Sequence, residues 1–399
     1  MSTDSIVVLG AARTPFARFD GALRDVVVPA LGGATVAEAL RRARVAPEDV
    51  DEVAIGVNFP GSDRSLARQI QLRAGIPEDR NSFTVDRACC SSLAALTIAR
   101  RGLLLGESTV AVAGGAENLG LVPYFLHGMR WGTRLGDVTV VDQLVISCPH
   151  TGVPRAVQAA EEAQKYGVGR EEQDAWALRS HVRYAEALAK GHLEDELHIT
   201  SYELPHGGHT GIEADEAHRP QASMETLASL GTVYGSATVT AGNAPGLSTG
   251  ASALVLSTRQ RARAGGHDEL AQVLSTAQAS GPPANIASIP ATAARKALHR
   301  AGLGIDDIDL IEINEAFAAV PLVTTLVLGD HDPARARELR TKTNVNGGAI
   351  AIGHPTGATA ARLVMTAAFE LRRRGGGTAL VTLCGGVGEA EATVIRVEG

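Results

Sequence analysis

The segments "ALRRARVAPEDVDEVAIG" (residues 39–56) and "ALHRAGLGIDDIDLIEIN" (residues 297–314) align without a gap, 258 positions apart. Ala, Leu, Arg, Ala, Asp, Asp and Ile recur at matching places. Each segment has the pattern of a helix end, an acidic turn and a strand rich in β-branched residues. A repeat of a whole helix–turn–strand unit predicts that the chain contains two homologous halves.

The similarity continues downstream of both segments. Residues 87–117, "RACCSSLAALTIARRGLLLGESTVAVAGGAE", and residues 353–389, "GHPTGATAARLVMTAAFELRRRGGGTALVTLCGGVGE", each show a turn, an apolar helix, Arg-rich residues, a strand and a Gly-Gly turn. Strands that alternate with helices predict an α/β fold with largely parallel sheets covered by helices. Functional residues are expected where equivalent strands end, near the axis that relates the halves.

The segment between the halves has a different character. It contains long amphipathic helical patterns and the His- and Gly-rich loop "LPHGGHTGIEADEAHRP". We therefore expect an N-terminal half over residues 1–118 and a C-terminal half over residues 251–399. An inserted loop domain is expected over residues 119–250, with its last strand rejoining the N-terminal half. Such an insertion is a usual place for substrate selection.

Composition narrows the class of protein. The chain has 399 residues, of which 45% are apolar and 20% charged, as is typical of a soluble globular enzyme. A net charge of −7 argues against a nucleic-acid or anionic-membrane partner, so small molecules are expected. The four cysteines and the absence of a signal-peptide pattern predict free thiols and a cytoplasmic location. The sequence contains no C-x-x-C or His-x3-His pair, so no metal site is expected.

Cys89 and Cys90 stand side by side where a strand is expected to meet a helix. Unpaired N–H groups and the positive end of the helix dipole favour a thiolate, so we expect a lowered cysteine pKa there. The alternative is that both cysteines are small core residues.

His354 lies between Gly353 and Pro355 at the equivalent turn of the other half. A histidine in such a turn is more often a cap or a packed residue. Because the two turns are equivalent across the repeat, we expect them to bring Cys89 and His354 together as a nucleophile and its base.

Two polar positions follow strands of the C-terminal half. Asn314 ends an apolar strand in "IEINEAFAA", and its side chain either caps the next helix or holds a water or an oxyanion. Cys384 precedes a Gly-rich turn whose N–H groups can point at one spot. It is either a buried structural residue or an acid/base that takes a proton from the carbon next to a thioester.

Taken together, these motifs resemble the thiolase family over essentially the whole chain. The matching segments, in order, are "AARTPFARFDGALRD", "GGAENL", "GMRWGTRLGD", "REEQDAWALRSH", "TVTAGNAPG", "NEAFA", "NVNGGAIAIGHPTGA" and "LCGG". The resemblance implies a five-layer αβαβα fold and an acyl-CoA C-acyltransferase of lipid or fatty acid metabolism. It also implies a homodimer or homotetramer that uses CoA thioesters and needs no metal or redox cofactor.

The family pattern V-N-x-x-C-x-S-G lies on residues 85–92 and assigns the nucleophile. By this register Cys89 is the nucleophile, and Cys90, about 100° further round a helix, packs. The resemblance implies that the N–H groups of Cys89 and Gly386 form the oxyanion hole of the acyl-enzyme.

The remaining roles also come from the resemblance. It implies that His354 activates the nucleophile and helps polarise the thioester, that Asn314 holds a water, and that Cys384 is the acid/base. The implied reaction is a ping-pong Claisen condensation or, in reverse, thiolytic cleavage of a 3-ketoacyl-CoA. The residues expected to line the acyl-CoA site are Arg155, Pro245, Ser248, Ile286 and Phe317.

Departures from the family pattern keep two alternatives open. Ser92 replaces the expected glycine, and "VDRACCSSLAAL" is similar to the ketosynthase pattern V-D-T-A-C-S-S-S-L. A ketosynthase pairs its cysteine with two histidines, but the segment expected to hold one of them reads "NEAFAAV" here. Thiolase chemistry is therefore favoured, with a carrier-bound or biosynthetic substrate kept open. A catalytically lapsed partner subunit is disfavoured because the four candidate catalytic side chains are retained.

Arg155 is the departure with the clearest chemical meaning. In "TGVPRAVQAAE" (residues 151–161), Pro154 and Arg155 stand where thiolases commonly have His and Met, and Pro245 replaces a serine in "AGNAPG". A guanidinium is costly to bury unless it is paired. Arg155 therefore pairs with a protein carboxylate, points to solvent, or meets an anionic group of the substrate such as a terminal carboxylate.

Overall fold

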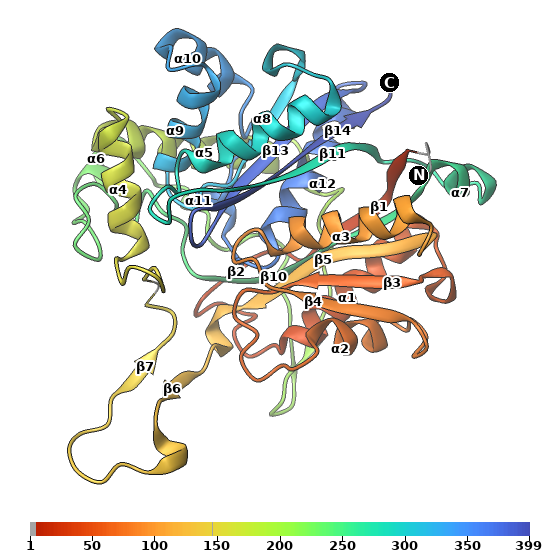
Figure 1. Ribbon diagram of the computed structural model, residues 1–399, viewed down its shortest axis with the longest axis horizontal. Helices are drawn as coiled ribbons and strands as arrows, with labels where there is room; N and C mark the ends of the chain where they lie inside the picture. The colour runs from red at the N-terminus through yellow and green to blue at the C-terminus, as the bar shows by residue number, and fades with distance from the viewer. Residues whose placement is uncertain (1–4, 146) are drawn as a thin grey trace.

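The computed structural model describes residues 5–145 and 147–399 (Figure 1). The strands of its main sheet are β1 (Ile6–Arg13), β2 (Ala17–Arg18), β3 (Glu52–Gly56), β4 (Asn81–Val85), β5 (Val110–Asn118), β10 (Ser248–Thr258), β11 (Ala271–Ser280), β12 (Leu310–Ile313), β13 (Gly377–Gly385) and β14 (Glu389–Val397). Two short hairpins add β6 (Tyr124–Leu126), β7 (Val140–Asp142), β8 (Tyr202–Glu203) and β9 (His209–Thr210).

Helices occupy much of the remaining chain. They are α1 (Val28–Ala43), α2 (Leu66–Arg73), α3 (Ser91–Leu105), α4 (Arg155–Lys165), α5 (Arg170–Ala189), α6 (Met224–Ala228), α7 (Arg259–Ala264), α8 (Ile289–Ala301), α9 (Ala319–Leu328), α10 (Pro333–Thr341), α11 (Ala349–Ile352) and α12 (Thr359–Arg373). Short 3-10 turns lie at Pro47–Asp49, Leu119–Leu121, Met129–Trp131 and Ile305–Asp307.

The sheet has two similar halves that meet at its centre. Its strand order is β12-β13-β14-β11-β1-β10-β5-β3-β4, with β2 paired to β10. The order β3-β5-β10-β1 on one side mirrors β12-β13-β14-β11 on the other, and a three-residue antiparallel pairing of β1 with β11 joins them. The repeated sequence segments end at β3 and β12, at equivalent places, which confirms two homologous halves.

Most neighbouring strands run antiparallel, so the expectation of largely parallel sheets was wrong. Parallel pairing is confined to β3 with β4 and β5, and to β12 with β13. β13 and β14 are joined by a short turn, which permits only antiparallel pairing. β10 pairs antiparallel with both β1 and β5.

Helices and sheet halves alternate in five layers (Figure 1). α3 and α12 form the central layer, and apolar residues such as Leu93 and Leu363 pack there against both sheet halves. α1 and α2 cover the outer face of the N-terminal half, and α8 covers that of the C-terminal half. By length and composition, residues 88–105 around α3 are apolar enough to cross a membrane, but 61% of that window is buried in this core.

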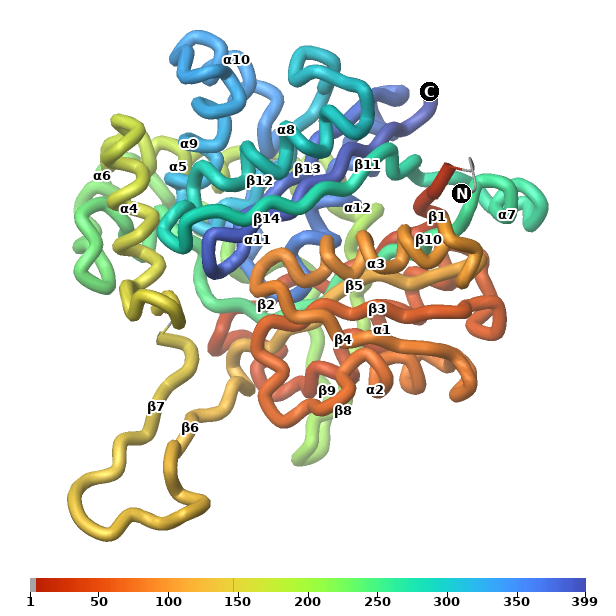
Figure 2. Tube along the Cα trace, in the orientation of Figure 1, coloured from red at the N-terminus to blue at the C-terminus, as the bar shows by residue number. Residues whose placement is uncertain are grey.

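The segment between the halves is partly an arm and partly a helical cover. β6 and β7 lie on an extended arm that leaves the body of the molecule, while α4, α5 and α6 pack beside α9 and α11 (Figures 1 and 2). β10 runs across the expected boundary at residue 250 and is wholly part of the N-terminal sheet half. The C-terminal half therefore begins after β10 and not at residue 251.

A buried ion-pair network ties this segment to the N-terminal half. The guanidinium of Arg13, at the end of β1, is fully buried and lies 2.8 Å from Glu196 and 2.6 Å from Asp215. Asp215 also accepts a hydrogen bond from the backbone N–H of Phe16. Two carboxylates from the insertion thus surround one cation of the sheet.

We expect Arg13→Met to destabilise the protein by about 3–5 kcal/mol, because it leaves two buried carboxylates without their cation. Urea unfolding of the full chain measures this change. The control is Arg24→Met, which removes a surface ion pair with Asp25. Because the Arg24 side chain is 62% exposed, this change should lower the free energy of unfolding by at most about 1 kcal/mol. Equal losses in the two variants would contradict the role given to Arg13.

Candidate active site

Cys89 lies in the sharp turn between β4 and α3. Ala88, the residue before it, has a φ of 48°, a left-handed conformation that costs energy for any residue except glycine. This turn leaves Cys89 partly exposed, while Cys90 at the N-cap of α3 is fully buried with its Sγ 3.7 Å from the carbonyl of Leu383. The geometry therefore makes Cys89 the accessible thiol and Cys90 a core residue.

His354 faces Cys89 from the equivalent turn before α12. Its Nε2 lies 3.3 Å from the Sγ of Cys89, and its Nδ1 lies 2.7 Å from the Oγ1 of Thr359. The hydroxyl of Thr359 donates to the carbonyl of Pro355, so its oxygen is left to accept from Nδ1–H. This arrangement favours the tautomer in which Nε2 carries the lone pair and can accept the proton of Cys89.

Asn314 stands on the other side of the same imidazole nitrogen. Its Nδ2 lies 3.3 Å from the Nε2 of His354 and can donate to it. Its Oδ1 is buried, and no donor in residues 5–145 or 147–399 reaches it. A buried acceptor without a partner is costly, so this oxygen is suited to a donor that arrives with the substrate or with a water.

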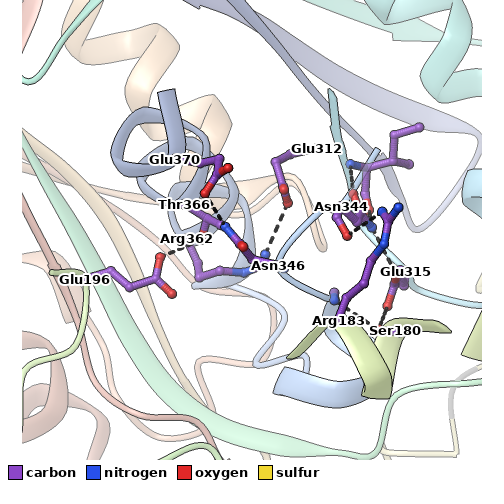
Figure 3. Close-up of polar contacts among 12 residues, drawn as sticks. Ser180, Arg183, Glu196, Glu312, Glu315, Asn344, Asn346, Arg362, Thr366 and Glu370 are labelled. Carbon is purple, nitrogen blue, oxygen red and sulfur yellow. Dashed lines mark hydrogen bonds and ion pairs between the residues drawn. The ribbon is translucent and has the colours of Figure 1, made fainter. Parts of the chain in front are cut away.

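Glu315, the next residue, holds Asn314 in place. Its buried carboxylate accepts hydrogen bonds from Trp176, Ser180, Asn344 and the backbone of Ile350, at 2.8–3.0 Å. Figure 3 shows this carboxylate between Ser180 and Asn344. Contacts from three separate segments thus anchor the loop that follows β12.

Burial shifts the pKa values of both Cys89 and His354. It raises the pKa of Cys89 to about 12, with a smaller rise from Glu117, against the lowering effect of Arg155. The expected lowering of this pKa by the helix end is therefore wrong, because desolvation outweighs it. Burial, with a smaller contribution from Arg362, lowers the pKa of His354 to about 3. A neutral thiol thus faces a neutral imidazole that is free to act as its base.

Arg362 and Glu312 form a buried pair whose charge acts on His354. Their side chains are fully buried and 3.5 Å apart; both are labelled in Figure 3. Burial raises the pKa of Glu312 to about 8. Arg362 therefore places positive charge near the imidazole and disfavours its protonation.

Cys384 and Gly386 approach the nucleophile from the end of β13. Cys384 is buried, and burial followed by the charge of Cys89 raises its pKa well above the usual range. A Cβ placed on Gly386 would stand 3.2 Å from the Cβ of Ala88 and 3.3 Å from the Nη2 of Arg155. The second cysteine, the glycine and Arg155 thus lie at the edge of the Cys89 turn.

Three residues expected to contact substrate have distinct surroundings. Ile286 is buried in an apolar cluster against α4, and Phe317 packs on the same cluster. Pro245 is half-buried in the loop before β10. Ile286 and Phe317 thus share one apolar cluster with Ala156, the neighbour of Arg155, while Pro245 lies outside it.

Ser248 has a structural contact in place of the expected substrate contact. Its Oγ accepts from the backbone N–H of His354 at 3.0 Å and donates to the carbonyl of Gly246 at 2.8 Å. Because both hydrogen bonds are made within the protein and the residue is buried, Ser248 positions the histidine turn.

Two further residues, which the sequence motifs did not indicate, position the catalytic groups. Thr359 selects the His354 tautomer. Glu117 is fully buried and accepts from the backbone of Asn58, Phe59 and Gly357 and from Thr356. Glu117 could have been found in the sequence as a lone acidic residue in "GGAENL", at the end of an apolar strand.

No group of three or more His, Cys, Asp or Glu residues in the described ranges is arranged to hold a metal ion. An accessible thiol, an imidazole base and a second thiol define a cysteine-dependent group-transfer site.

Comparisons with known proteins specify the class. The chain matches the family models "Thiolase, N-terminal domain" over residues 6–260 and "Thiolase, C-terminal domain" over residues 267–397. It is 37% identical to an acetyl-CoA acetyltransferase of Syntrophomonas wolfei and to beta-ketothiolase BktB of Cupriavidus necator, with 99% of each chain covered in both cases.

Solved structures give the same result. Crystal structures of the Bacillus anthracis acetyl-CoA acetyltransferase (34% identity, 98% of both chains) and of human mitochondrial 3-ketoacyl-CoA thiolase (35% identity, 99% of both chains) superpose with a TM-score of 0.93. The chain therefore belongs to the thiolase family, and it is an acyltransferase.

We expect Cys89→Ala to abolish acyl-enzyme formation, because it removes the only thiol that contacts His354 among the described residues. Cys90→Ala is the control, because that thiol is buried away from the imidazole. The acylation rate of this variant should stay within about tenfold of the wild type. Intact-mass measurement after mixing with acetyl-CoA detects the acyl group. An acylated Cys89→Ala protein would contradict the assignment.

We expect Thr359→Val to slow acylation about 10- to 100-fold, because Nδ1–H loses its acceptor and the imidazole no longer presents a fixed base. Thr359→Ser keeps the hydroxyl and should recover most of the rate. CoA release under single-turnover conditions measures both. Unchanged acylation in Thr359→Val would show that the tautomer does not depend on this contact.

Proposed function

We propose that this chain is an acyl-CoA C-acyltransferase that works by a ping-pong mechanism through an acyl-enzyme on Cys89. The observation that supports this most strongly is the contact of Cys89 with a neutral His354, whose Nε2 also meets Asn314. Because burial raises the pKa of Cys89, the attack on the thioester is proposed to occur together with the proton transfer to His354.

The first half-reaction moves the acyl group onto the protein. The Cys89 sulfur bonds to the thioester carbon, and the carbon–sulfur bond to CoA breaks. His354 passes the proton of Cys89 to the departing CoA sulfur, so no net charge is left. The backbone N–H groups of Cys89 and Gly386 are proposed to donate to the oxyanion during this step.

The second half-reaction forms a carbon–carbon bond. Burial raises the pKa of Cys384, so this group starts as a thiol and releases its own proton as it takes the α-proton of a second thioester. The carbanion attacks the acyl group on Cys89, and the released Cys89 sulfur takes up, through His354, the proton that Cys384 gave up, so no net charge is left. In the reverse direction, CoA cleaves a 3-ketoacyl-CoA by the same steps. The unpartnered Oδ1 of Asn314 supports a bound water near the reacting oxygen.

A ketosynthase-type enzyme is the alternative that the Cys motif suggested. It would place a second histidine beside the first, but Asn314 occupies the position facing the Nε2 of His354. A carrier-bound substrate therefore has no support beyond the motif. A lapsed partner subunit is also disfavoured, because Cys89 and His354 are already within hydrogen-bonding distance.

We also propose that the enzyme works in the cytoplasm as a homodimer or homotetramer. The four cysteines are free thiols, which suits a reducing compartment. The β6–β7 arm exposes apolar side chains, including Trp131 (89% exposed) and Leu135 (94% exposed), which are costly in water unless another surface covers them.

We expect Cys384→Ala to acylate at Cys89 but to lose condensation, because acylation needs only the first thiol and its base whereas carbanion formation needs a second base. Intact mass follows the acyl-enzyme, and deuterium exchange from solvent into the methyl group of acetyl-CoA follows carbanion formation. Cys148→Ala is the matched control at a buried thiol with no assigned role. Exchange at the wild-type rate in Cys384→Ala would contradict the role given to Cys384.

A further inference from the structure

Arg155 has no carboxylate partner among the residues that the structure describes. Its Nη1 donates to the Oε1 of Gln158 at 2.8 Å, one turn along α4. No carboxylate of residues 5–145 or 147–399 forms an ion pair with it. Of the three possibilities for this arginine, pairing with a protein carboxylate is therefore wrong for the described chain.

The guanidinium of Arg155 also contacts the edge of the candidate active site. Arg155 is half-buried, and its Nη2 lies 3.3 Å from the point that a Cβ on Gly386 would occupy. The same point is 3.2 Å from Ala88, which precedes the nucleophile. Arg155 therefore lies where the Cys89 turn meets the Cys384 loop, and its charge lowers the pKa of both thiols against the effect of burial.

Two acidic groups whose charge acts on the same thiols as Arg155 are already occupied. Glu162 of α4 accepts from the backbone N–H groups of Ala287 and Ser288. Glu117 is held by four donors. Burial raises the pKa of the Cys148 thiol, but hydrogen bonds with Thr151 and His150 and the charge of Arg155 lower it to about 7, so Cys148 balances this charge only in part.

The local structure gives Arg155 no stabilising role. It is the first residue of α4, where the helix dipole disfavours a cation. The neighbouring Ala156 and Ile286 belong to an apolar cluster on which an uncharged side chain would pack. A half-buried cation that opposes both its helix and its neighbours indicates an anion that arrives with the substrate.

We propose that Arg155 binds a carboxylate at the far end of the acyl group, so that this enzyme transfers short dicarboxylyl groups from CoA. This inference rests on the proposed acyl-CoA transfer. Gln158 fixes one edge of the guanidinium, and the remaining N–H groups can donate to two carboxylate oxygens at once. Because Arg155 lies beside Gly386, only a few carbons separate that carboxylate from the thioester.

The phosphates of CoA are the other source of negative charge. They lie at the opposite end of the pantetheine arm from the thioester, whereas Arg155 adjoins the residues that surround the thioester carbon. The acyl carboxylate is therefore the favoured ligand. The bonds made and broken on Cys89 are the same as for an uncharged acyl group.

The test compares acyl transfer to Cys89 from succinyl-CoA and from butyryl-CoA, which have four-carbon acyl groups with and without a carboxylate. We expect the wild type to prefer succinyl-CoA, and Arg155→Met to lower the succinyl/butyryl ratio of kcat/KM at least about tenfold, or about 1.4 kcal/mol. Arg155→Lys keeps the positive charge but loses the planar group that donates two hydrogen bonds to one carboxylate. We expect its succinyl/butyryl ratio of kcat/KM to lie between those of the wild type and Arg155→Met.

The control variant is Lys165→Met, which removes an exposed cation from the other end of α4 and should leave the ratio unchanged. A wild-type preference for butyryl-CoA, or an unchanged ratio in Arg155→Met, would overturn the inference. The wild-type preference decides the question even if a variant does not fold.

Two further measurements distinguish a carboxylate ligand from a CoA phosphate, and a failed inference from a failed proposed function. Succinyl- and butyryl-pantetheine lack the phosphates of CoA; if the preference and its dependence on Arg155 persist with them, the carboxylate is the ligand. If Arg155→Met lowers kcat/KM equally for succinyl-CoA and butyryl-CoA and has no effect with the pantetheine thioesters, Arg155 binds CoA phosphate and the inference is wrong. Acylation of Cys89 by butyryl-CoA but not by succinyl-CoA contradicts only the inference, whereas no acylation by any CoA thioester, acetyl-CoA included, contradicts the proposed function.

Discussion

One hydrogen bond at the centre of the molecule joins the two halves at their active turns. The Oγ of Ser92, in the first turn of α3, accepts from the backbone N–H of Ala361 in the first turn of α12 at 3.0 Å. Ser92 stands where the family pattern has glycine, so this departure adds a contact between the helices that follow the nucleophile and the base. Nearby, a Cβ on Gly115 would stand 1.9 Å from the carbonyl oxygen of Gly357, so only glycine permits this approach.

The burial of the two turns also shifts the pKa values of Cys89 and His354, and so sets which of them carries the proton. Desolvation favours neutral forms, so Cys89 keeps its proton and His354 lacks one in the empty site. The site therefore does not depend on a stored thiolate. It depends on a fixed imidazole lone pair, and Thr359 and Asn314 supply the contacts that orient it.

The departures from the family pattern differ in what they change. Ser92 has its hydroxyl paired within the protein, so it alters packing and not chemistry. Arg155 has no carboxylate partner in the described part of the chain and lies beside Gly386 at the edge of the Cys89 turn. Sequence comparison alone ranks these two substitutions equally, because both replace an uncharged family residue. Their surroundings distinguish them, since an unpaired buried charge needs a ligand and a paired hydroxyl does not.

The sequence by itself determined the two-half α/β fold, the register that distinguishes Cys89 from Cys90, and the expectation that His354 faces the nucleophile. Repeats, helix periodicity and motif spacing are local patterns, so they can be read without coordinates. Only the tertiary structure decided that most strands run antiparallel, that Ser248 holds the His354 backbone, and that desolvation raises the pKa of Cys89. The same holds for the unpaired Arg155. Each of these depends on groups that are distant in sequence, because charge states and hydrogen-bond partners are set by what folding places around a group.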